Sequence, residues 1–488
     1  MTSRAHCVGV WGHYYGANLG DDLVARVIVE AVRRRDPSSE VRGFSLDPTD
    51  TERRHGIRAW PITSYPDNDR GRAATGGGGR FSHLAAGLLR RAGSLWREAP
   101  HLARSYWALR PVDLLVVAGS GQLLDTWSGA WGHPYTLFKW SLLARLTGTR
   151  MAFLSVGAGP IESRLARWFI RWAVEAGSEV TVRDVHSAQV LRDIGVRRSL
   201  EVVPDMGFGL EAAEVAEVAE VDGKPEVDGK AEVDAAEDGG AASQPAGGAS
   251  ARPMHAGRGV RPFEGLTVGV NAMAHAHARY WGRGDEGRYD VYLDKMAAVV
   301  RRLVEGGARV VLFSSQVRAD PQTAEDLLAR LGAAGVPVVG RGAEDVAGVA
   351  GVAGAGCRVV YRPVREVDDL VRVVRGCDYV IATRYHSVLL PLLMGIPTMG
   401  LAYHPKTVHL MAAAGQGAYC LDIDSFTETQ LMTRFGDLCR KRTSAVHRLR
   451  EGIPALSGAV RSQFDHVLFT SGTFVGSSAV AREEPTGR

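Results

Sequence analysis

Short apolar runs alternate with stretches of helical periodicity along most of this chain, and that alternation limits the folds open to it. In the first part, strands are expected at Cys7–Trp11, Asp113–Ala118, Met151–Val156, Glu179–Val182 and Leu200–Val203, with helices at Asp21–Arg35, Tyr135–Leu146, Leu165–Ala176 and Ser187–Ile194. Strands that alternate with helices form βαβ units, whose crossover connections require a parallel sheet. Residues 1–210 are therefore predicted to form one α/β lobe.

The composition changes sharply after this lobe, and the alternation then returns. Residues 211–262 consist mostly of Ala, Glu, Gly, Val and Asp, and the pentapeptide Glu220–Lys224 recurs at Glu226–Lys230. Such a segment cannot bury enough apolar surface to offset the entropy lost on ordering, so it is predicted to be a disordered linker. Beyond it, strands are expected at Leu266–Val270, Arg309–Phe313, Val336–Val339, Arg358–Tyr361, Asp378–Ala382 and Thr398–Ala402, with helices at Tyr292–Glu305 and Thr323–Leu331.

The predicted organisation is therefore a two-lobed α/β protein. The second lobe spans residues 263–425, helices follow at 426–470, and a disordered polar tail is expected at 471–488. Two Rossmann-like lobes with mainly parallel sheets are expected to face each other across a cleft, because ligands of such sheets bind at the carboxyl ends of the strands.

Charge and cysteine content exclude several classes of function. The net charge of +4 over 488 residues is too small to indicate a nucleic-acid partner. Cys7, Cys357, Cys377, Cys420 and Cys439 are scattered and form no C-x-x-C pair, which argues against a disulfide framework and against a zinc site. The N-terminus lacks the long apolar region of a signal peptide and no apolar run is long enough to span a bilayer, so a cytoplasmic protein is expected.

Residues 81–110 fit no strand of either predicted sheet. The segment mixes leucine and tryptophan with arginine. Such a stripe more commonly packs on its own protein. The alternative is a peripheral contact with the inner face of a membrane, where lipid-linked sugars are found.

Glycines and acidic residues follow the first predicted strand in the stretch Gly12–Asp22. Gly20 would let a ligand approach the backbone, and Asn18 stands at the start of a helix whose free N–H groups attract anions. Asp21 and Asp22 either cap that helix and complement its dipole, or contact a substrate. The local pattern leaves both roles open.

Two more strands of the first lobe end in residues of interest. Gly119 and Gly121 form a turn after a buried strand, where a ligand is expected, although such turns also occur without one. Arg183 and Asp184 follow another strand, and they either pair with each other to fix the loop or contribute to function. Ser187 is expected to cap the next helix.

The strongest stretch is Arg384-Tyr-His386-Ser387. A buried strand ends just before Arg384, and a helix that is apolar on every side runs on to Gly395, so that helix must be buried. His386 and Ser387 are thus expected at its N-terminus, where free N–H groups, the helix dipole and an arginine fork favour a phosphate or carboxylate. A histidine beside a core is often structural, but the adjacent arginine and this position favour a functional role.

Two further stretches are expected to face the same cleft. Lys406 follows the strand at Thr398–Ala402, and it either completes an anion site or is a solvated lysine. Arg279 follows the first strand of the second lobe together with His275 and His277. Two histidines with no carboxylate close in sequence are a weak metal signal, so neither a metal nor a cofactor is expected.

In their order and spacing these stretches resemble the polysaccharide pyruvyl transferase family. The matching stretches are Asn18–Asp22, the Gly119 turn, Arg183–Ser187, Pro204–Asp205, Arg384–Ser387 and Tyr403–Lys406. Asp22 stands where the family usually has Glu, and Ser120 replaces a glycine of its triple-glycine turn. The family is similar in architecture to two-lobed glycosyltransferases of the GT-B type.

The resemblance implies a transferase of cell-envelope polysaccharide biosynthesis that moves the pyruvyl group of phosphoenolpyruvate onto a sugar, glycan or lipid-linked glycan as a cyclic ketal. Phosphoenolpyruvate carries a phosphate and a carboxylate, which suits a cationic pocket. On this hypothesis His386 is the general acid, Arg384 and Lys406 hold the anionic groups, and Asp21 or Asp22 orients or deprotonates the sugar hydroxyls. The other expected substrate contacts are Ser387, Asn18, Gly20, Gly119, Gly121, Arg183 and Arg279.

Two other functions fit the same fold. A GT-B glycosyltransferase that uses a nucleotide sugar would need the same lobes and a positive site for its diphosphate, but no acidic residue stands near the buried helix to hold a ribose. A non-catalytic sugar-binding protein would keep the fold without the chemistry, and the intact Arg384 and His386 weigh against it.

Overall fold

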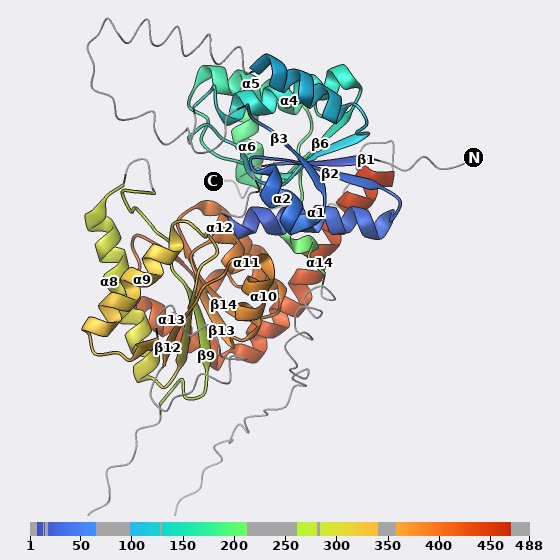
Figure 1. Ribbon diagram of the computed structural model, residues 1–488. Coiled ribbons are helices and arrows are strands. Elements are labelled where there is room, and N and C mark those ends of the chain that lie inside the picture. Colours follow the sequence, from blue (N-terminus) through green and yellow to red (C-terminus); the bar gives the residue numbers. More distant parts are fainter. Residues whose placement is uncertain are drawn as a thin grey trace, which may run out of the picture.

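The computed structural model contains two parallel α/β lobes stacked one on the other (Figure 1). It describes residues 7–12, 14, 18–64, 98–126, 129–211, 261–280, 284–339 and 358–469. Almost all of the predicted linker, the whole predicted tail and residues 81–97 lie outside these ranges.

The first lobe is built on an eight-stranded sheet in the order β3-β2-β1-β4-β6-β7-β8, with β5 paired to β6, and all its pairings are parallel. Its strands are β1 (Cys7–Trp11), β2 (Glu40–Ser45), β3 (Arg58–Pro61), β4 (Leu114–Val117), β5 (Ser120–Leu123), β6 (Arg150–Ala158), β7 (Glu179–Val182) and β8 (Glu201–Val202). Its helices are α1 (Leu19–Arg35), α2 (Pro48–His55), α4 (His133–Thr147), α5 (Arg164–Ala176), α6 (Val185–Asp193) and the 3₁₀ turn η2 (Met206–Gly209). The strand order reverses between β1 and β4, which is where ligands of such sheets bind.

The second lobe repeats this plan in a seven-stranded parallel sheet of order β11-β12-β10-β9-β13-β14-β15. Its strands are β9 (Thr267–Asn271), β10 (Arg309–Phe313), β11 (Val338–Val339), β12 (Val359–Arg362), β13 (Tyr379–Ala382), β14 (Thr398–Ala402) and β15 (Cys420–Asp422). Its helices are α8 (Glu286–Glu305), α9 (Asp320–Ala333), α10 (Val367–Arg375), α11 (Tyr385–Leu393), α12 (Pro405–Ala413), α13 (Glu428–Arg440), α14 (Arg442–Phe469) and the turn η3 (Gly417–Tyr419). The reversal lies between β9 and β13, so α11 begins at the second switch point.

The caps of two helices differ from those expected from the sequence. Asn18 caps α1 by accepting a hydrogen bond from the Gly20 N–H at 3.2 Å, so Asp21 and Asp22 are first-turn residues rather than caps. Asp184 caps α6 by accepting from the Ser187 N–H at 2.7 Å, so the prediction that Ser187 is the cap is wrong. Each cap stands two or three residues before the N–H group that it accepts from. At this distance a short side chain reaches the free N–H groups of the first turn best.

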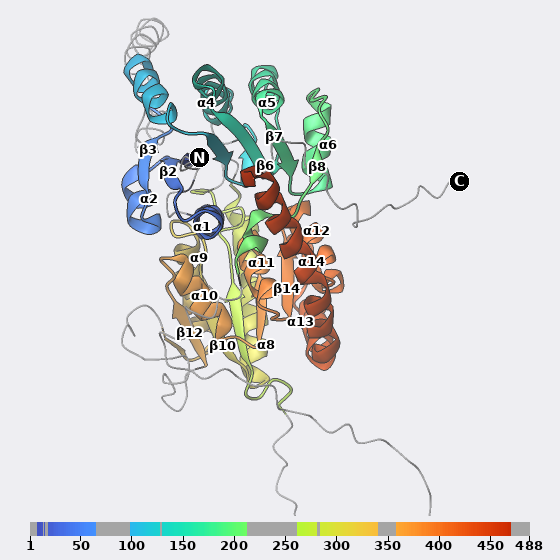
Figure 2. The ribbon, with the colours of Figure 1, turned by 90° about the vertical axis from the view of Figure 1, so that its right-hand side faces the viewer.

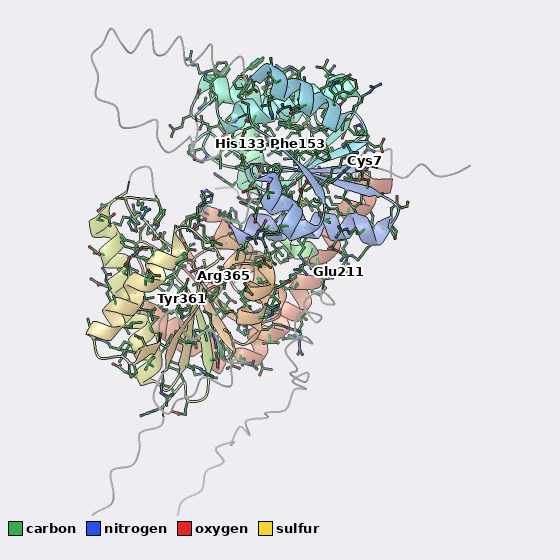
Figure 3. The ribbon with its side chains drawn as sticks, viewed as in Figure 1. Cys7, His133, Phe153, Glu211, Tyr361 and Arg365 are labelled. Carbon is green, nitrogen blue, oxygen red and sulfur yellow. The ribbon has the colours of Figure 1, made fainter. Side chains whose placement is uncertain are left out.

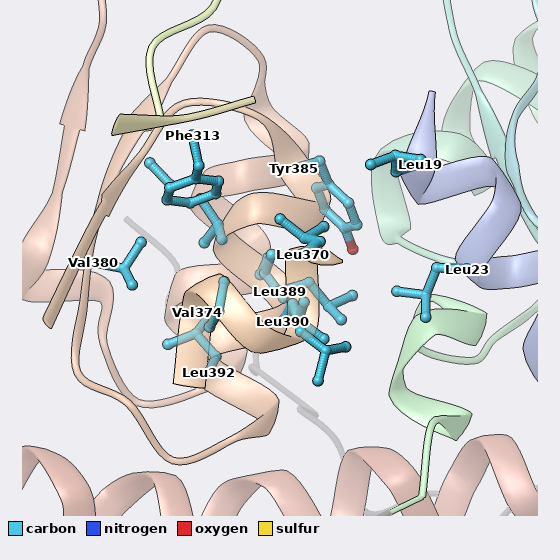
Figure 4. Close-up of a cluster of buried hydrophobic side chains, with 14 of the residues drawn as sticks. Leu19, Leu23, Phe313, Leu370, Val374, Val380, Tyr385, Leu389, Leu390 and Leu392 are labelled. Atoms are coloured by element: carbon cyan, nitrogen blue, oxygen red, sulfur yellow. The ribbon is translucent and has the colours of Figure 1, made fainter. Parts of the chain in front are cut away.

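One continuous apolar core joins the lobes. Helices α4, α5 and α6 cover the face of the first sheet that points away from the second lobe, and α1 lies on the opposite face (Figure 2). The buried side chains of α1 therefore pack against the second lobe, with Leu19 and Leu23 facing Tyr385, Leu389 and Leu390 of α11 (Figure 4). This apolar contact fixes the position of the first turn of α1 relative to the first turn of α11.

Helical residues 98–109 form the described end of the segment that fitted no strand. Ala108 and Leu109 are buried in the core beneath α4, so this end packs on its own protein. Trp107 points outward and is 62% exposed. Within the described ranges, no helix is both long and apolar enough to cross a membrane.

The last helix, α14, runs from the second lobe back to the first sheet (Figure 2). Its fully buried Gln463 accepts a hydrogen bond from the Thr181 hydroxyl and donates one to the Ser155 hydroxyl at 3.1 Å. Ser155 has a positive φ of 49° where the pairing of β6 with β7 changes register. The glutamine thus ties the end of the chain to an irregular point of the first sheet.

We expect Gln463→Ala to lower the free energy of unfolding by about 1–3 kcal/mol, because it removes the acceptor of the buried Thr181 hydroxyl and the side-chain partner of the buried Ser155 hydroxyl. The measurement is urea denaturation followed by circular dichroism. Gln189→Ala is the matched control, since Gln189 is exposed on α6 and should change stability by no more than about 0.5 kcal/mol. Equal effects of the two variants would contradict the role assigned to Gln463.

Candidate active site

The turn between β13 and α11 is fixed at the switch point of the second sheet. The Asn271 side chain, at the end of β9, accepts a hydrogen bond from the Arg384 N–H at 3.2 Å. The Thr383 hydroxyl donates to the Asn271 carbonyl oxygen at 3.1 Å. These bonds hold Arg384 at the N-cap of α11, where the helix dipole adds positive potential.

Arg384 forms an ion pair with the carboxylate of Asp320. Its Nη2 donates to Asp320 Oδ1 at 2.6 Å and its Nε donates to Asp320 Oδ2 at 3.1 Å, while Asp320 is fully buried. Burial alone would lower the pKa of this guanidinium, but the Asp320 charge raises it, so Arg384 stays charged. Its side chain keeps 24% of its surface exposed, which leaves donors for a ligand.

Arg183 comes to the same place from the first lobe. Its guanidinium lies directly on Gly157, where a Cβ would overlap it, and stacks on the Tyr385 ring at 5.3 Å. Its Nη1 lies 3.7 Å from Asp205 Oδ2, and its Nε donates to Asp184 at 3.3 Å. The predicted pairing of Arg183 with Asp184 is therefore present, together with contacts that reach across the lobes.

Lys406 supplies a third cation. Its Nζ lies 5.5 Å from the centre of the Tyr385 ring and 5.2 Å from that of Tyr403, which is typical of a cation–π contact. No carboxylate of the described residues lies within 4.0 Å of it. Lys406 is thus the least neutralised cation of the three.

The titration of neighbouring groups reports the positive field that these cations create. Burial alone would raise the pKa of the Tyr403 phenol, but the charges of Lys406, Arg384 and Arg183 lower it below its ordinary value. Burial, together with the charges of Lys406 and Arg183, lowers the pKa of His404 to about 4, so that ring is neutral at pH 7. Both shifts indicate a positive potential at this point, which would attract an anion.

We expect Lys406→Met to raise the pKa of the Tyr403 phenol, because removal of the nearest cation destabilises the phenolate. The measurement is ultraviolet difference absorbance during alkaline titration, with the Tyr403→Phe protein subtracted to isolate this phenol. Lys295→Met is the control, since Lys295 also lies over an aromatic ring, Phe426, at 5.0 Å. An unchanged phenol pKa in Lys406→Met would mean that the lysine does not act on the site.

His386 lies between the two lobes and is 7% exposed. One side of its ring lies against the backbone of Gly20 in α1, so close that a Cβ there would overlap the ring. On the other side its Nε2 lies 3.5 Å from Asp205 Oδ1. Burial alone would raise the pKa of the Asp205 carboxyl, but His386, Arg183 and the Gly207 N–H lower it, so this fully buried residue is an anion that orients the histidine.

Asp22 is not brought to His386. Its carboxylate lies 3.4 Å from Arg54 Nη1 and 3.5 Å from His55 Nε2, on the side of α1 that faces α2. There it lines a cavity of about 180 Å³ between the lobes, together with Arg26, Arg53, Arg54, His55, Glu366, Val367 and Asp368. Arg54 also donates to the carbonyl oxygen of Arg365, which lies in the second lobe below α1 and α2 (Figure 3). This charged cavity lies between the lobes, at a place separate from the cations around Tyr385.

The other predicted contacts of the first lobe have varied surroundings. Asp21 stays half-buried beside Asn18, whose Nδ2 donates to it at 2.9 Å. Gly119 is buried, and a Cβ there would lie 2.8 Å from the Leu154 carbonyl oxygen, so the glycine allows close approach of two strands. Gly121 has open space beside it, with only Leu124 nearby.

Ser387 and Arg279 contact other residues than the three cations. Ser387 is fully buried and its hydroxyl donates to that of Ser315 at 2.8 Å. Arg279 is exposed and stacks on its neighbour Tyr280. The nearby His275 and His277 pair with separate carboxylates, and the described residues hold no group of three or more His, Cys, Asp or Glu suited to a metal ion.

Some residues of the site were not predicted as site residues. Asp205, Tyr385, Tyr403 and Asp320 surround the cations and the histidine. The first three lie inside stretches that carried the family resemblance, which was the available signal. Asp320 follows no recognisable motif, and only the fold brings the first residue of α9 beside Arg384.

Comparisons with known proteins agree with this architecture. A family model described as polysaccharide pyruvyl transferase matches residues 18–405. No curated protein sequence matches the chain. A solved structure of the Anabaena protein HepE in complex with UDP has a TM-score of 0.50 at 12% identity, covering 95% of this chain and 99% of that one.

Two sugar-nucleotide epimerases are similar in the same way. A putative UDP-N-acetylglucosamine 2-epimerase from Listeria monocytogenes has a TM-score of 0.51 at 11% identity, covering 95% of this chain and 96% of that one. The UDP-GlcNAc 2-epimerase from Neisseria meningitidis, bound to UDP-GlcNAc, has a TM-score of 0.51 at 10% identity, covering 95% and 99%. At such identities the likeness shows the fold alone, which is the predicted GT-B-like pair of Rossmann-like lobes.

Proposed function

The chain belongs to the polysaccharide pyruvyl transferase family, and from this premise we propose that it moves the pyruvyl group of phosphoenolpyruvate onto a sugar diol as a cyclic ketal and releases phosphate. The family match makes it a transferase. The donor, the ketal product and the roles of single residues are the content of the proposal.

The observation that carries the proposal is the meeting of three cations from both lobes around one pair of tyrosines. Arg183 comes from the end of β7, while Arg384 and Lys406 come from the openings of α11 and α12. Phosphoenolpyruvate carries two anionic groups, a phosphate and a carboxylate, on the same vinyl carbon. Cations held at several points can bind both groups at once and fix the vinyl carbon between them.

The chemistry needs an acid and then two attacks by hydroxyl groups. Protonation of the methylene carbon of phosphoenolpyruvate turns it into a methyl group and makes the adjacent carbon electrophilic. One sugar hydroxyl adds to that carbon and loses its proton, the carbon–oxygen bond to phosphate breaks, and the second hydroxyl adds and loses its proton to close the ring. One hydroxyl proton replaces the proton given to carbon and the other leaves with phosphate, so the protons balance.

We assign the acid to His386. The Asp205 anion stabilises the protonated ring and holds its orientation, as the carboxylate does in other histidine pairs. Because the ring is buried against Gly20, a substrate reaches it only when the opening of α1 moves relative to α11. Ligand-driven motion of this kind is common where a site lies between two lobes.

We assign the acceptor hydroxyls to Asp21 rather than Asp22. Asp21 lies half-buried beside Asn18 at the opening of α1, the end of the helix that contacts α11. Asp22 is held by Arg54 and His55 on the other side of the helix. The carboxylate of Asp21 can orient an acceptor hydroxyl or accept its proton.

The test is calorimetric binding of phosphoenolpyruvate, with UDP and GDP as comparison ligands. We expect wild-type protein and Lys295→Met to bind phosphoenolpyruvate alike, and Lys406→Met to bind it at least about tenfold more weakly, because a hydrogen bond to a charged group is worth about 1.5–3 kcal/mol. Lack of any phosphoenolpyruvate binding by the wild-type protein would overturn the proposal.

A nucleotide-sugar-dependent transferase or epimerase is the second candidate. It is favoured by the fold shared with proteins solved with UDP or UDP-GlcNAc. Against it, neither α11 nor α12 has an acidic residue in its first turn that could hold a ribose. Binding of UDP or GDP without binding of phosphoenolpyruvate would favour this candidate.

A further inference from the structure

The outer face of the first lobe carries an exposed apolar surface. Five exposed side chains and the half-buried Phe138 form it; they come from α4, from α5 and from Trp131, two residues before α4. We call it the aromatic face: Trp131, Phe138, Leu142, Leu146, Leu165 and Trp168. Trp131 is 71% exposed, Leu146 is 63% exposed and Trp168 is 51% exposed. The two helices lie side by side on the face of the sheet that points away from the second lobe (Figures 1 and 2).

The aromatic face is continuous rather than a set of scattered residues. Phe138 of α4 lies 5.1 Å from the ring of Trp168 and 4.9 Å from that of Trp172, both in α5. Phe138, Leu142 and Leu146 follow one another at intervals of one helical turn, so they form a stripe along α4. Large contiguous apolar surfaces on a folded chain usually mark a site of interaction.

The exposed charges on α4 and α5 beside this face are mainly positive. Arg145, Arg164 and Arg167 are exposed beside it, and no carboxylate of the described residues lies within 4.0 Å of any of them. Helix α4 contains no acidic residue, and α5 contains only Glu175. A partner for this face should therefore combine an apolar interior with a negative surface.

A second copy of the chain fits this face poorly. A twofold contact would place the same patch on both sides, so arginines of one copy would face arginines of the other with few carboxylates to pair with. A bilayer that contains anionic lipids fits better, because tryptophan prefers the boundary between headgroups and acyl chains and arginine is attracted to acidic headgroups.

We propose that the aromatic face docks the protein on the surface of a membrane that contains anionic lipids. The apolar side chains of α4 and α5 enter the headgroup region, and Arg145, Arg164 and Arg167 contact acidic headgroups. The proposed contact is peripheral, because side chains of α4 and α5 make it; no described helix is long and apolar enough to cross a bilayer. The proposal does not depend on the reaction that the protein catalyses.

The experiment is flotation of the full chain with vesicles of phosphatidylcholine alone or with about one third phosphatidylglycerol. We expect binding to the anionic vesicles only. The double variant Arg164→Gln and Arg167→Gln should bind about twenty-fivefold more weakly, from about fivefold per arginine near a negative surface. The double variant Leu146→Ser with Trp168→Ser should bind the anionic vesicles at least about tenfold more weakly.

The matched control is Val291→Ser with Arg301→Gln, because these residues are an exposed hydrophobic and an arginine on α8 of the other lobe. All variants change exposed positions and should keep the thermal midpoint and the binding of phosphoenolpyruvate. Three outcomes would overturn the proposal: equal binding to both kinds of vesicle, binding that the patch variants do not weaken, and a dimer that the patch variants dissociate while the wild type ignores vesicles.

Discussion

His386→Gln is expected to lower the turnover of phosphoenolpyruvate, measured as phosphate release in the presence of an acceptor sugar, by roughly 10²- to 10⁴-fold. Glutamine fills a similar space, and its amide can donate toward the nearby Asp205 carboxylate. It has no proton acidic enough to transfer to the methylene carbon, so the loss falls on kcat. The dissociation constant of phosphoenolpyruvate should change little, because Arg183, Arg384 and Lys406 remain in place.

The control for this loss is His447→Gln on α14, where the side chain is 70% exposed and pairs with Glu451. That variant should keep full turnover. An inactive His386→Gln protein has either lost its acid or misfolded at the site. Calorimetry separates these explanations, because a misfolded site would also lose phosphoenolpyruvate binding. Turnover within about threefold of the wild type would place the acid elsewhere.

Those elements that the sequence predicts best are the buried ones. The strands at Glu179–Val182, Arg309–Phe313 and Thr398–Ala402 have the predicted bounds, because a strand of a parallel sheet covered on both faces is a continuous apolar run. Strands β2 and β3 were not predicted. They begin with Glu40 and Arg58, and β3 is the edge strand with β2 beside it. Both mix apolar residues with charged residues, glycine or proline, so they give no such run.

The site was predictable in its cations and less so in its carboxylates. Arg183, Arg384 and Lys406 each follow a strand, and the carboxyl ends of parallel strands meet at one edge, so their convergence follows from the fold class. Asp22 did not join them because residues 20 and 22 of a helix point about 200° apart. Since Gly20 faces His386, Asp22 faces α2. The sequence does not show which side of α1 meets α11, so it could not show that Asp22 points away from His386.

The same contact between α1 and α11 makes Gly20→Ala informative. Alanine is the better helix former by about 1 kcal/mol, so helix propensity alone predicts a more stable protein. A Cβ at this position would overlap the His386 ring, which is buried between Gly20 and Asp205 and has nowhere to move. Overpacking of this kind costs about 1–3 kcal/mol, so the clash should exceed the gain in propensity and the variant should be less stable than the wild type.

Gly436→Ala is the matched control, because Gly436 lies inside α13 and a Cβ there would meet only the end of Arg440 at 3.5 Å. We expect it to raise the free energy of unfolding by about 0.5–1 kcal/mol, opposite in sign to Gly20→Ala. Displacement of His386 by the new methyl group should also lower turnover in Gly20→Ala, while Gly436→Ala keeps it. If both variants were stabilised and active, the lobes would not meet at Gly20 and His386 in solution, and the histidine would be free to reach a substrate without movement of α1.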